Sequence, residues 1–260
     1  MEKKILFFDV DSTLYSHKSN SIPNSAVEAI KIAKNNGHII VLATGRSKLL
    51  TSTLGIFDVI DFDYFVTING TLVLDKNDNV IFSLPCQKDA IDKVMKIVDK
   101  HELNLCFINK DDFYLYRDED ERSHLGYDPL HIEVPNKKEY QNEDIYQMNL
   151  FCEDSYVEEF IDATGDFLSY SKLDNYGYDV YAKNQTKATG IIHLINYLGI
   201  DISDTIAFGD GHNDSEMIEL CNVGVAMGNA IDKVKKVSNY VTDDIDNDGI
   251  YKAMKYLKLI

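Results

Sequence analysis

The chain has 260 residues, enough for one large domain or two modest ones. Hydrophobic residues make up 45% of the chain and charged residues 27%, which excludes the disordered, collagen-like and fibrous classes. Its 43 acidic residues outnumber its 26 basic ones, and the resulting net charge of −17 would repel nucleic-acid backbones and anionic membranes. We therefore expect neither nucleic acid nor a membrane as a partner.

The sequence shows no sign of export. No segment approaches the roughly 20 consecutive apolar residues that a membrane-spanning helix requires. The apolar run over 5–8 meets Asp9 at once and is too short for the core of a signal peptide. The four cysteines lie at least 20 residues apart, which fits neither a dense disulfide framework nor a Cys-x-x-Cys metal site. We expect a cytoplasmic protein with reduced cysteines.

Strand and helix patterns alternate over the first third of the chain. Short continuous apolar runs predict buried strands at 5–8, 39–43 and 64–67. Helical patterns occupy the intervals, one over 24–36 and one from about residue 47. Strands separated by helices pair in parallel, so this order indicates a doubly wound sheet.

The pattern changes after residue 70. Two apolar runs, 71–74 and 80–84, flank a turn cluster and predict a hairpin. From residue 87 to about 183 the expected order is a helix, several strands rich in Tyr and Phe, a helix near 155–163 and two further strands. This order is typical of an α+β domain.

Alternation returns in the last part of the chain, with strands expected at 205–208, 223–226 and 240–241 and helices between them. We therefore predict an α/β fold whose core is a doubly wound, Rossmann-like parallel sheet. The predicted core comprises residues 1–82 and 183–260, and the predicted insert is an α+β cap over residues 83–182.

Acidic residues follow two of the core strands. Asp9 and Asp11 end the first strand, and Asp210 and Asp214 follow the strand at 205–208. Ligands of open α/β sheets bind at the carboxyl ends of the strands, where acids so close together repel unless a cation lies between them. Carboxylate oxygens suit a hard cation, so the sequence predicts a Mg²⁺ site at this edge.

Two further features are expected at the same edge. Thr44, Gly45 and Arg46 end the second strand, where a hydroxyl and backbone N–H groups could hold a phosphoryl oxygen. Lys187 opens the helix that follows the insert and supplies a positive charge.

Together these motifs resemble the haloacid dehalogenase superfamily of aspartate-dependent phosphatases. The matching motifs are, in order, Asp9-x-Asp11-x-Thr13-Leu14, Thr44, Lys187, and Gly209-Asp210-x-x-Asn213-Asp214. The large insert, together with Thr44-Gly45-Arg46, Asn69-Gly70 and Ala226-Met227-Gly228-Asn229-Ala230, is similar to the Cof-type branch with a large C2-type cap.

The resemblance implies a Mg²⁺-dependent phosphatase whose partner is a small phosphate ester, with a sugar phosphate as the expected substrate. Asp9 would be the nucleophile that forms an aspartyl-phosphate, and Asp11 the general acid and base. The Mg²⁺ ligands would be Asp9, the backbone carbonyl of Asp11, Asp210, and Asp214 as a direct or supporting ligand.

The resemblance also implies a set of groups that bind the phosphoryl oxygens. These groups are the backbone N–H of Val10 and the residues Thr44, Gly45, Arg46, Asn69, Lys187 and Asn213. Thr44 and Lys187 would also take part in catalysis. The family often has Gly directly after the lysine, whereas Ala188 follows Lys187 here, so Lys183 stays an alternative.

Two other functions remain as alternatives. A phosphomutase or phosphotransferase would share the core residues and pass the phosphoryl group back to a substrate. A phospho-acceptor signalling domain also uses an acidic strand end, a Thr and a Lys, but it needs neither the second acid at Asp11 nor an insert of about 100 residues. The sequence carries no signal for an oligomeric state.

Overall fold

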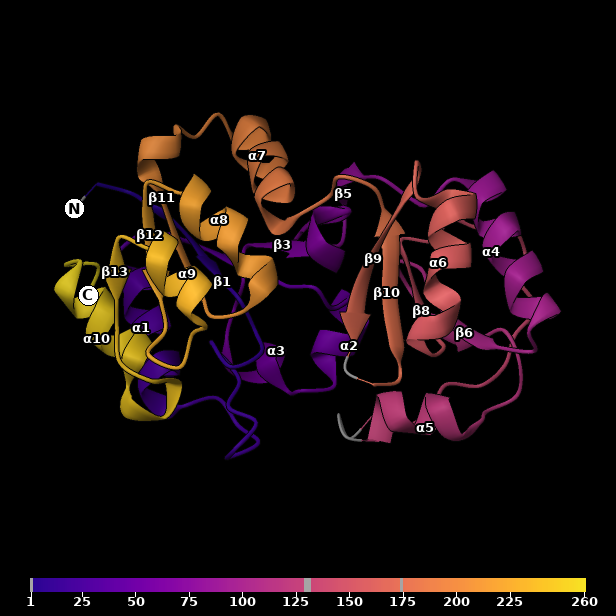
Figure 1. The fold of residues 1–260 in the computed structure, drawn as a ribbon. Coiled ribbons are helices and arrows are strands. Elements are labelled where there is room, and N and C mark those ends of the chain that lie inside the picture. The colour runs from indigo at the N-terminus through magenta and orange to yellow at the C-terminus, as the bar shows by residue number, and fades with distance from the viewer. Residues whose placement is uncertain (1, 129–131, 174) are drawn as a thin grey trace. The chain divides into compact units, whose positions relative to one another are not determined.

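The computed structural model describes residues 2–128, 132–173 and 175–260. The chain forms two compact units, one made of residues 1–83 and 186–260 and the other of residues 84–185 (Figure 1). The second unit is therefore an insertion into the first.

The first unit is built on a sheet whose described strands run in the order β13-β12-β11-β1-β2-β3-β4-β5. The strands from β13 to β3 pair in parallel, and β4 and β5 add an antiparallel hairpin at one edge. Their bounds are β1 (Ile5–Phe8), β2 (Ile39–Ala43), β3 (Tyr64–Thr67), β4 (Leu72–Asp75), β5 (Val80–Ser83), β11 (Thr205–Gly209), β12 (Val223–Ala226) and β13 (Tyr240–Val241). The predicted doubly wound sheet is confirmed.

Helices cover this sheet. Helix α1 packs against α10, whereas α7 packs against α8 and α8 against α9. The helices are α1 (Asn24–Asn35), α2 (Lys48–Ser52), α3 (Ile56–Val59), α7 (Lys187–Leu198), α8 (Ser215–Leu220), α9 (Asp232–Val237) and α10 (Gly249–Tyr256), with short 3-10 turns η1 (Ile68–Gly70), η3 (Ile202–Asp204), η4 (His212–Asp214) and η5 (Ile245–Asn247). The four residues of β1 are at most 1% exposed, as expected of a central strand with both faces covered.

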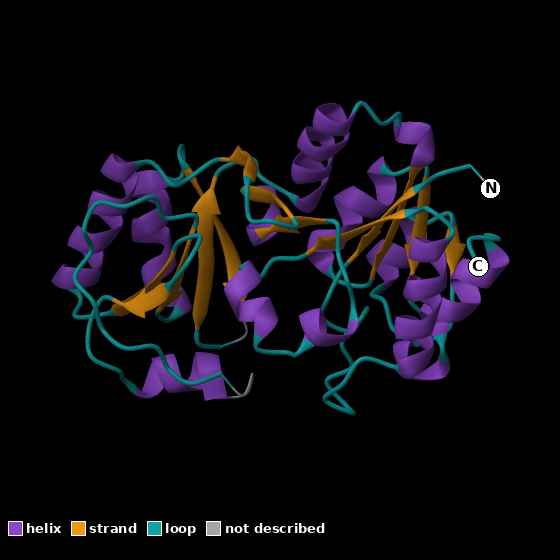
Figure 2. Cartoon of the chain, turned by 180° about the vertical axis from the view of Figure 1, so that it is seen from behind, coloured by secondary structure: helices purple, strands orange, loops and turns teal. Residues whose placement is uncertain are grey.

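The second unit is an antiparallel sheet with helices against it (Figure 2). Its described strands run in the order β7-β6-β8-β10-β9. They are β6 (Asn104–Ile108), β7 (Phe113–Leu115), β8 (Gln147–Phe151), β9 (Leu168–Leu173) and β10 (Gly177–Ala182), and the helices are α4 (Lys88–Lys100), α5 (Glu121–Tyr127) and α6 (Asp154–Thr164). Val94 and Phe160, from α4 and α6, share a buried core with Phe107, Met148 and Val180 of the sheet.

The register of the core sheet places the carboxyl ends of β1, β2 and β11 next to one another. Phe8 lies opposite both Leu42 of β2 and Phe208 of β11. The rings of Phe8 and Phe208 stack with their centroids 4.7 Å apart. The residues that follow β1, β2 and β11 therefore emerge side by side at one edge of the sheet.

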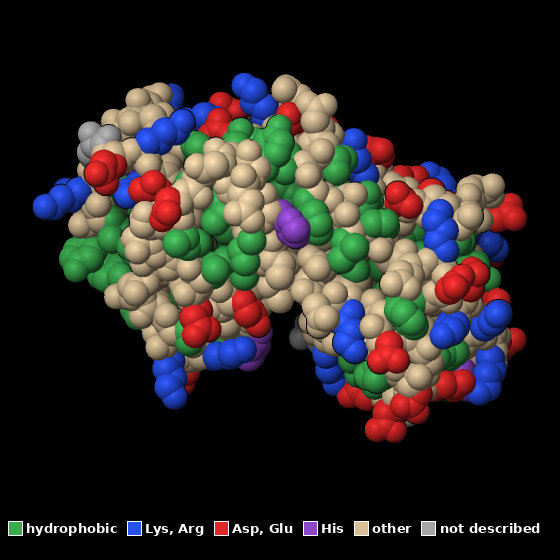
Figure 3. All heavy atoms as spheres, turned by 90° about the horizontal axis from the view of Figure 1, so that it is seen from above, with side chains coloured by type: hydrophobic (Ala, Val, Ile, Leu, Met, Phe, Trp, Pro, Cys, Tyr) green, Lys and Arg blue, Asp and Glu red, His purple; other side chains and the backbone are tan. Residues whose placement is uncertain are grey.

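The described cysteines are free and buried, as the sequence predicts. Burial raises the pKa of Cys86, Cys106, Cys152 and Cys221 to about 12, which keeps these thiols protonated and unreactive. Within the part of the chain that the structure describes, no helix is both long and apolar enough to cross a membrane. Acidic and basic side chains are interspersed over the face shown in Figure 3.

Candidate active site

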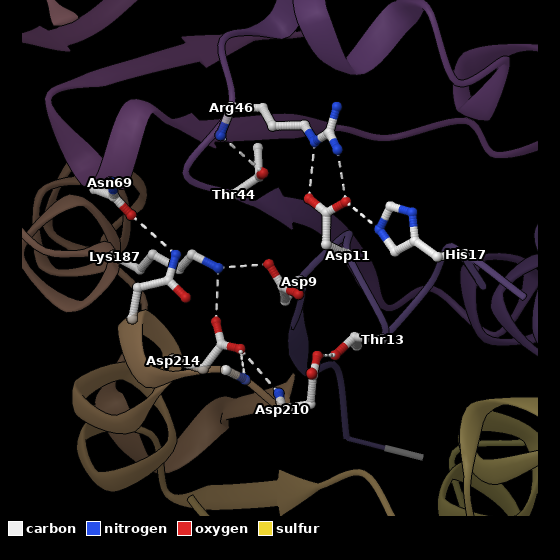
Figure 4. Close-up of polar contacts among 12 residues, drawn as sticks. Asp9, Asp11, Thr13, His17, Thr44, Arg46, Asn69, Lys187, Asp210 and Asp214 are labelled. Atoms are coloured by element: carbon white, nitrogen blue, oxygen red, sulfur yellow. Dashed lines mark hydrogen bonds and ion pairs between the residues drawn. The ribbon is translucent and has the colours of Figure 1, made fainter. Parts of the chain in front are cut away.

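A buried lysine lies at the centre of the site. The Nζ of Lys187 is 2.5 Å from Oδ1 of Asp9 and 2.6 Å from Oδ1 of Asp214 (Figure 4). Its side chain is fully buried, which by itself would lower the pKa of Lys187, but the two carboxylates outweigh burial and raise this pKa. Lys187 is therefore a fixed positive charge that holds together the ends of β1 and β11.

Local sequence explains why Lys187 points into the core unit. Thr186 caps α7, because its backbone N–H donates to Oγ1 of Thr189 at 3.0 Å while its own Oγ1 accepts from the Thr189 N–H at 3.3 Å. This reciprocal cap starts the helix at Lys187. Lys183, the alternative lysine, belongs to the other unit and donates to the carbonyl of Gly165, whereas Lys187 contacts Asp9 and Asp214.

The second oxygen of Asp214 fixes the loop after β11. Oδ2 of Asp214 accepts from the backbone N–H groups of Asp210 and Gly211, each at 2.8 Å. A Cβ on Gly209 would lie 2.7 Å from both Cβ and Cγ of Asp214. Glycine at 209 therefore allows the Asp214 carboxylate to reach the strand end.

Asp210 completes a cluster of three acids. Its Oδ1 accepts from Oγ1 of Thr13 at 2.6 Å. Burial raises the pKa of Asp210 to about 7. The hydrogen bond from Thr13 lowers this pKa, whereas the negative charge of Asp214 raises it further. Asp9, Asp210 and Asp214 each offer a carboxylate oxygen, and these three oxygens lie within 4.8 Å of one another.

This donor set fits a magnesium ion. Mg²⁺ prefers oxygen ligands and is commonly held by carboxylates beside a phosphate. Three carboxylates and the Lys187 ammonium leave two negative charges, which one divalent cation would balance. Burial and the charge of Asp214 raise the pKa of Asp9 well above its ordinary value, and Lys187 only partly opposes them. A bound cation would keep Asp9 ionised.

The side chain of Asp11 makes different contacts. Its carboxylate accepts a bidentate pair of hydrogen bonds from Arg46, in which Nε donates to Oδ2 and Nη2 donates to Oδ1, both at 2.8 Å. Nε2 of His17 lies 2.8 Å from the same Oδ1. Burial would raise the pKa of Asp11, but hydrogen bonds from His17 and Arg46 outweigh burial and hold this pKa well below its usual range. Arg46, expected to bind phosphate, here binds Asp11.

The other expected phosphate-binding residues surround Gly45. Oγ1 of Thr44 accepts from the Arg46 N–H at 3.1 Å, and Nδ2 of Asn213 donates to Oδ1 of Asn69 at 3.1 Å. A Cβ on Gly45 would lie 3.1 Å from Oδ1 of Asn69 and 3.3 Å from Nδ2 of Asn213. Glycine therefore lets the two amides approach the end of β2.

Val10 sets the turn after β1. Its carbonyl accepts from the N–H groups of Leu14 at 2.9 Å and Tyr15 at 2.7 Å. Ser12 takes a left-handed conformation, with φ of 60°. The chain thus turns sharply after Asp9.

Comparison with known proteins decides the family. The haloacid dehalogenase-like hydrolase family matches residues 6–254. The chain belongs to this family. YkrA of Bacillus subtilis (strain 168), provisionally named a phosphatase, is 34% identical over 262 residues that span the whole of both chains.

Solved structures agree with this assignment. A protein of Geobacillus kaustophilus HTA426 shares 32% identity and a TM-score of 0.93, with both chains fully covered. BT4131, a sugar phosphatase of haloacid dehalogenase subclass IIB, shares 31% identity and a TM-score of 0.85, covering 99% of this chain and 100% of its own. The expected resemblance is confirmed, and the chain is a phosphatase of the haloacid dehalogenase-like family.

Two contacts at the site of this phosphatase escaped sequence reasoning. His17 lies in the loop after β1, and nothing in its neighbours indicates that its ring returns to Asp11. Asn229 bridges two loops, because its Nδ2 donates to the Ser12 carbonyl at 2.8 Å and its Oδ1 accepts from the Ile245 N–H at 3.0 Å. The Met-Gly-Asn-Ala motif marked Asn229 but not its partners.

Proposed function

We propose that the chain is a Mg²⁺-dependent phosphatase that hydrolyses a small phosphorylated metabolite, with a sugar phosphate as the favoured class, through an aspartyl-phosphate. The observation that carries this proposal is the buried Lys187 between Asp9 and Asp214, with Asp210 beside them. Such a group combines a nucleophile, a fixed positive charge and oxygen ligands for a cation.

Two displacements at phosphorus make up the proposed reaction. A carboxylate oxygen of Asp9 bonds to phosphorus as the bond to the leaving oxygen breaks, and Asp11 in its neutral form gives that oxygen its proton. Water then bonds to phosphorus as the aspartyl bond breaks, and Asp11 takes the proton of the water. The nucleophile and the acid are regenerated, and inorganic phosphate is released.

Charge stabilisation and positioning dominate phosphoryl transfer. The Mg²⁺ would be held by Asp9, Asp210, Asp214 and the backbone carbonyl of Asp11, and when bound it would neutralise charge on the phosphoryl oxygens. We assign the phosphoryl oxygens to groups that follow β1, β2, β3 and β11 or begin α7, namely the Val10 N–H, Thr44, Gly45, Asn69, Lys187 and Asn213, whereas Arg46 holds Asp11.

The inserted unit would select the substrate. We propose that residues 83–182 act as a cap whose side chains recognise the leaving group, because the core residues assigned here concern only the phosphoryl group common to all esters. BT4131, of similar fold, is named a sugar phosphatase, which supports the same class here.

A screen of phosphorylated metabolites tests this function. We expect Mg²⁺-dependent release of inorganic phosphate from sugar phosphates, and no release by an Asp9→Asn variant. Transfer of the phosphoryl group to a second sugar without phosphate release would instead indicate the phosphomutase or phosphotransferase. A stable phosphoprotein without turnover would indicate the signalling domain.

A further inference from the structure

The carboxylate of Asp11 is held from two sides by two side chains. Arg46 donates to both of its oxygens, and His17 contacts Oδ1, all at 2.8 Å. Oδ1 accepts hydrogen bonds in the ionised form of Asp11 and also in the neutral form that carries its proton on Oδ2, so Nε2 of His17 is the donor in this pair. Figure 4 shows Asp11 directed toward Arg46 and His17, whereas Asp9 and Asp214 gather around Lys187.

The two oxygens of Asp11 are not equivalent. Each carboxylate oxygen has about two positions that accept a hydrogen bond. Among the described side chains, Oδ1 receives both Arg46 Nη2 and His17 Nε2, whereas Oδ2 receives only Arg46 Nε. Oδ1 is therefore saturated, and Oδ2 keeps one accepting position open.

The loop that carries His17 is anchored. Ser16 pairs with Ser21 through the backbone, with the Ser16 N–H 2.9 Å from the Ser21 carbonyl. Oγ of Ser16 donates to Oδ1 of Asp246 at 2.6 Å. The His17 ring packs edge-on against Tyr15, with centroids 5.3 Å apart. These contacts hold the ring in place although the His17 side chain is 46% exposed.

We propose that His17 is a positioning residue that acts through Asp11. By sharing Oδ1 with Arg46, His17 fixes the plane of the carboxylate and leaves Oδ2 as the oxygen that exchanges the proton. In the first displacement the neutral form of Asp11 passes the proton on Oδ2 to the leaving oxygen, and in the second Oδ2 takes a different proton from the attacking water. The inference rests on the proposed role of Asp11 as acid and base.

Leaving groups of different basicity test this role. A nitrophenolate departs without a proton, whereas an alkoxide requires one. We expect His17→Ala to lower kcat/KM for glycerol phosphate by about tenfold, a fraction of what a general acid contributes, and to change kcat/KM for 4-nitrophenyl phosphate less than about twofold. His17→Gln, which keeps an N–H donor, should recover part of the alkyl ester activity.

Lys18→Ala is the matched control, because Lys18 is next in the loop, its side chain is 84% exposed and it pairs with Asp246 at 3.6 Å. This variant should hydrolyse both esters at the wild-type rate. Equal slowing of both esters by His17→Ala, no slowing of either, or the same selectivity from Lys18→Ala would each overturn the proposal.

A crystal structure of His17→Ala gives a readout that does not depend on turnover. Without His17 the Asp11 carboxylate should occupy more than one orientation, and an unchanged single orientation would contradict the proposal. If wild-type enzyme released phosphate from no ester, the proposed function would fail, and this structure alone would decide whether His17 positions Asp11.

Discussion

At the scale of single residues, the site depends on a buried cation with two anionic partners. Lys187 is fully buried, and Asp9 and Asp214 are only 5% and 1% exposed. Removing one member of a buried ion pair costs about 3–5 kcal/mol, because the remaining charge has no partner. Lys187 therefore contributes to the fold as well as to the proposed reaction.

We expect Lys187→Ala to lower kcat/KM for all phosphate esters in parallel by about 10²- to 10³-fold, because it removes charge stabilisation from the transition state that they share. The free energy of unfolding should fall by about 3–5 kcal/mol in urea titrations, since Asp9 and Asp214 lose their partner. Kinetics on a panel of esters checks the first effect, and selective slowing of one ester would contradict it.

Asp9→Asn should abolish turnover while the protein stays folded, because the amide cannot attack phosphorus but can still accept a hydrogen bond from Lys187. Acid-quenched reactions with labelled substrate should trap a phosphoenzyme in the wild type and none in the variant. Circular dichroism provides the control for folding. Normal phosphate release by a folded Asp9→Asn variant would refute the assignment of Asp9 as the nucleophile.

Sequence alone predicted the shared strand edge but not each contact there. Asp9, Asp210 and Asp214 follow buried strands, and strand order brings such positions together. The side chain of Asp11 instead contacts Arg46 and His17, because their N–H donors lie nearest to its carboxylate. Local sequence does not encode a contact that depends on the path of a loop.

At the scale of elements, one face of the sheet of the inserted unit carries a group of polar side chains. Met148 and Val180 point into the buried core, so their neighbours Gln147, Asn149 and Asp179 share the other face. Oδ1 of Asp179 accepts from Nε2 of Gln147 at 2.7 Å and Nδ2 of Asn149 at 2.6 Å. Because Gln147 Nε2 is committed to a carboxylate, its buried Oε1 is left without a partner among the described residues.

Polar side chains such as these suit the hydroxyl groups of a sugar. We expect Gln147→Leu to change the ranking of sugar phosphates by kcat/KM while leaving 4-nitrophenyl phosphate within about twofold, since leaving-group recognition and phosphoryl chemistry are separate. Lys172→Ala is the control, because Lys172 is half-exposed and pairs with Asp154. An unchanged ranking would show that this face does not select the substrate.

A buried histidine joins the starts of β1 and β2. The Lys4 N–H donates to Nδ1 of His38 at 3.0 Å, and burial lowers the pKa of His38 below its ordinary 6.5. Below pH 6.5 the unfolded chain therefore binds a proton at His38 more readily than the folded chain does. The free energy of unfolding decreases as the pH is lowered through this range.

The His38 contribution to stability should thus be complete above pH 6.5 and be lost as the pH falls below it. His38→Asn keeps an acceptor without titrating. Urea unfolding at pH 7.5 and 5.5 should show a larger loss for the wild type than for the variant. Equal losses would mean that other groups account for the pH dependence.

At the scale of the whole molecule, the fold class followed from sequence but the strand order of the insert did not. Apolar runs predicted the buried strands of the core closely, for example 5–8 and 223–226. In the insert, β6 pairs with β8, about 40 residues further along the chain. Alternation of side chains indicates which face of a strand is buried, but it does not identify the neighbouring strand.

Magnesium should stabilise the folded protein as well as activate it. Three carboxylates gather in the folded chain only, so Mg²⁺ binding favours the folded state. Chelation should abolish activity and lower Tm, and added Mg²⁺ should restore both, whereas Ca²⁺ should inhibit because its coordination is larger and looser. Asp210→Asn should weaken the shift in Tm. Full activity after exhaustive chelation would refute the assignment of Mg²⁺ as a cofactor.

The position of β1 in the core sheet has a consequence for synthesis on the ribosome. β1 pairs with β2 on one side and with β11, about 200 residues later, on the other. Until Thr205–Gly209 has left the exit tunnel, the apolar β1 is an exposed edge strand, the kind of surface that promotes aggregation. The nascent chain therefore has to be protected at β1 throughout translation of the insert, and Asp9 meets Asp214 only near the end of synthesis.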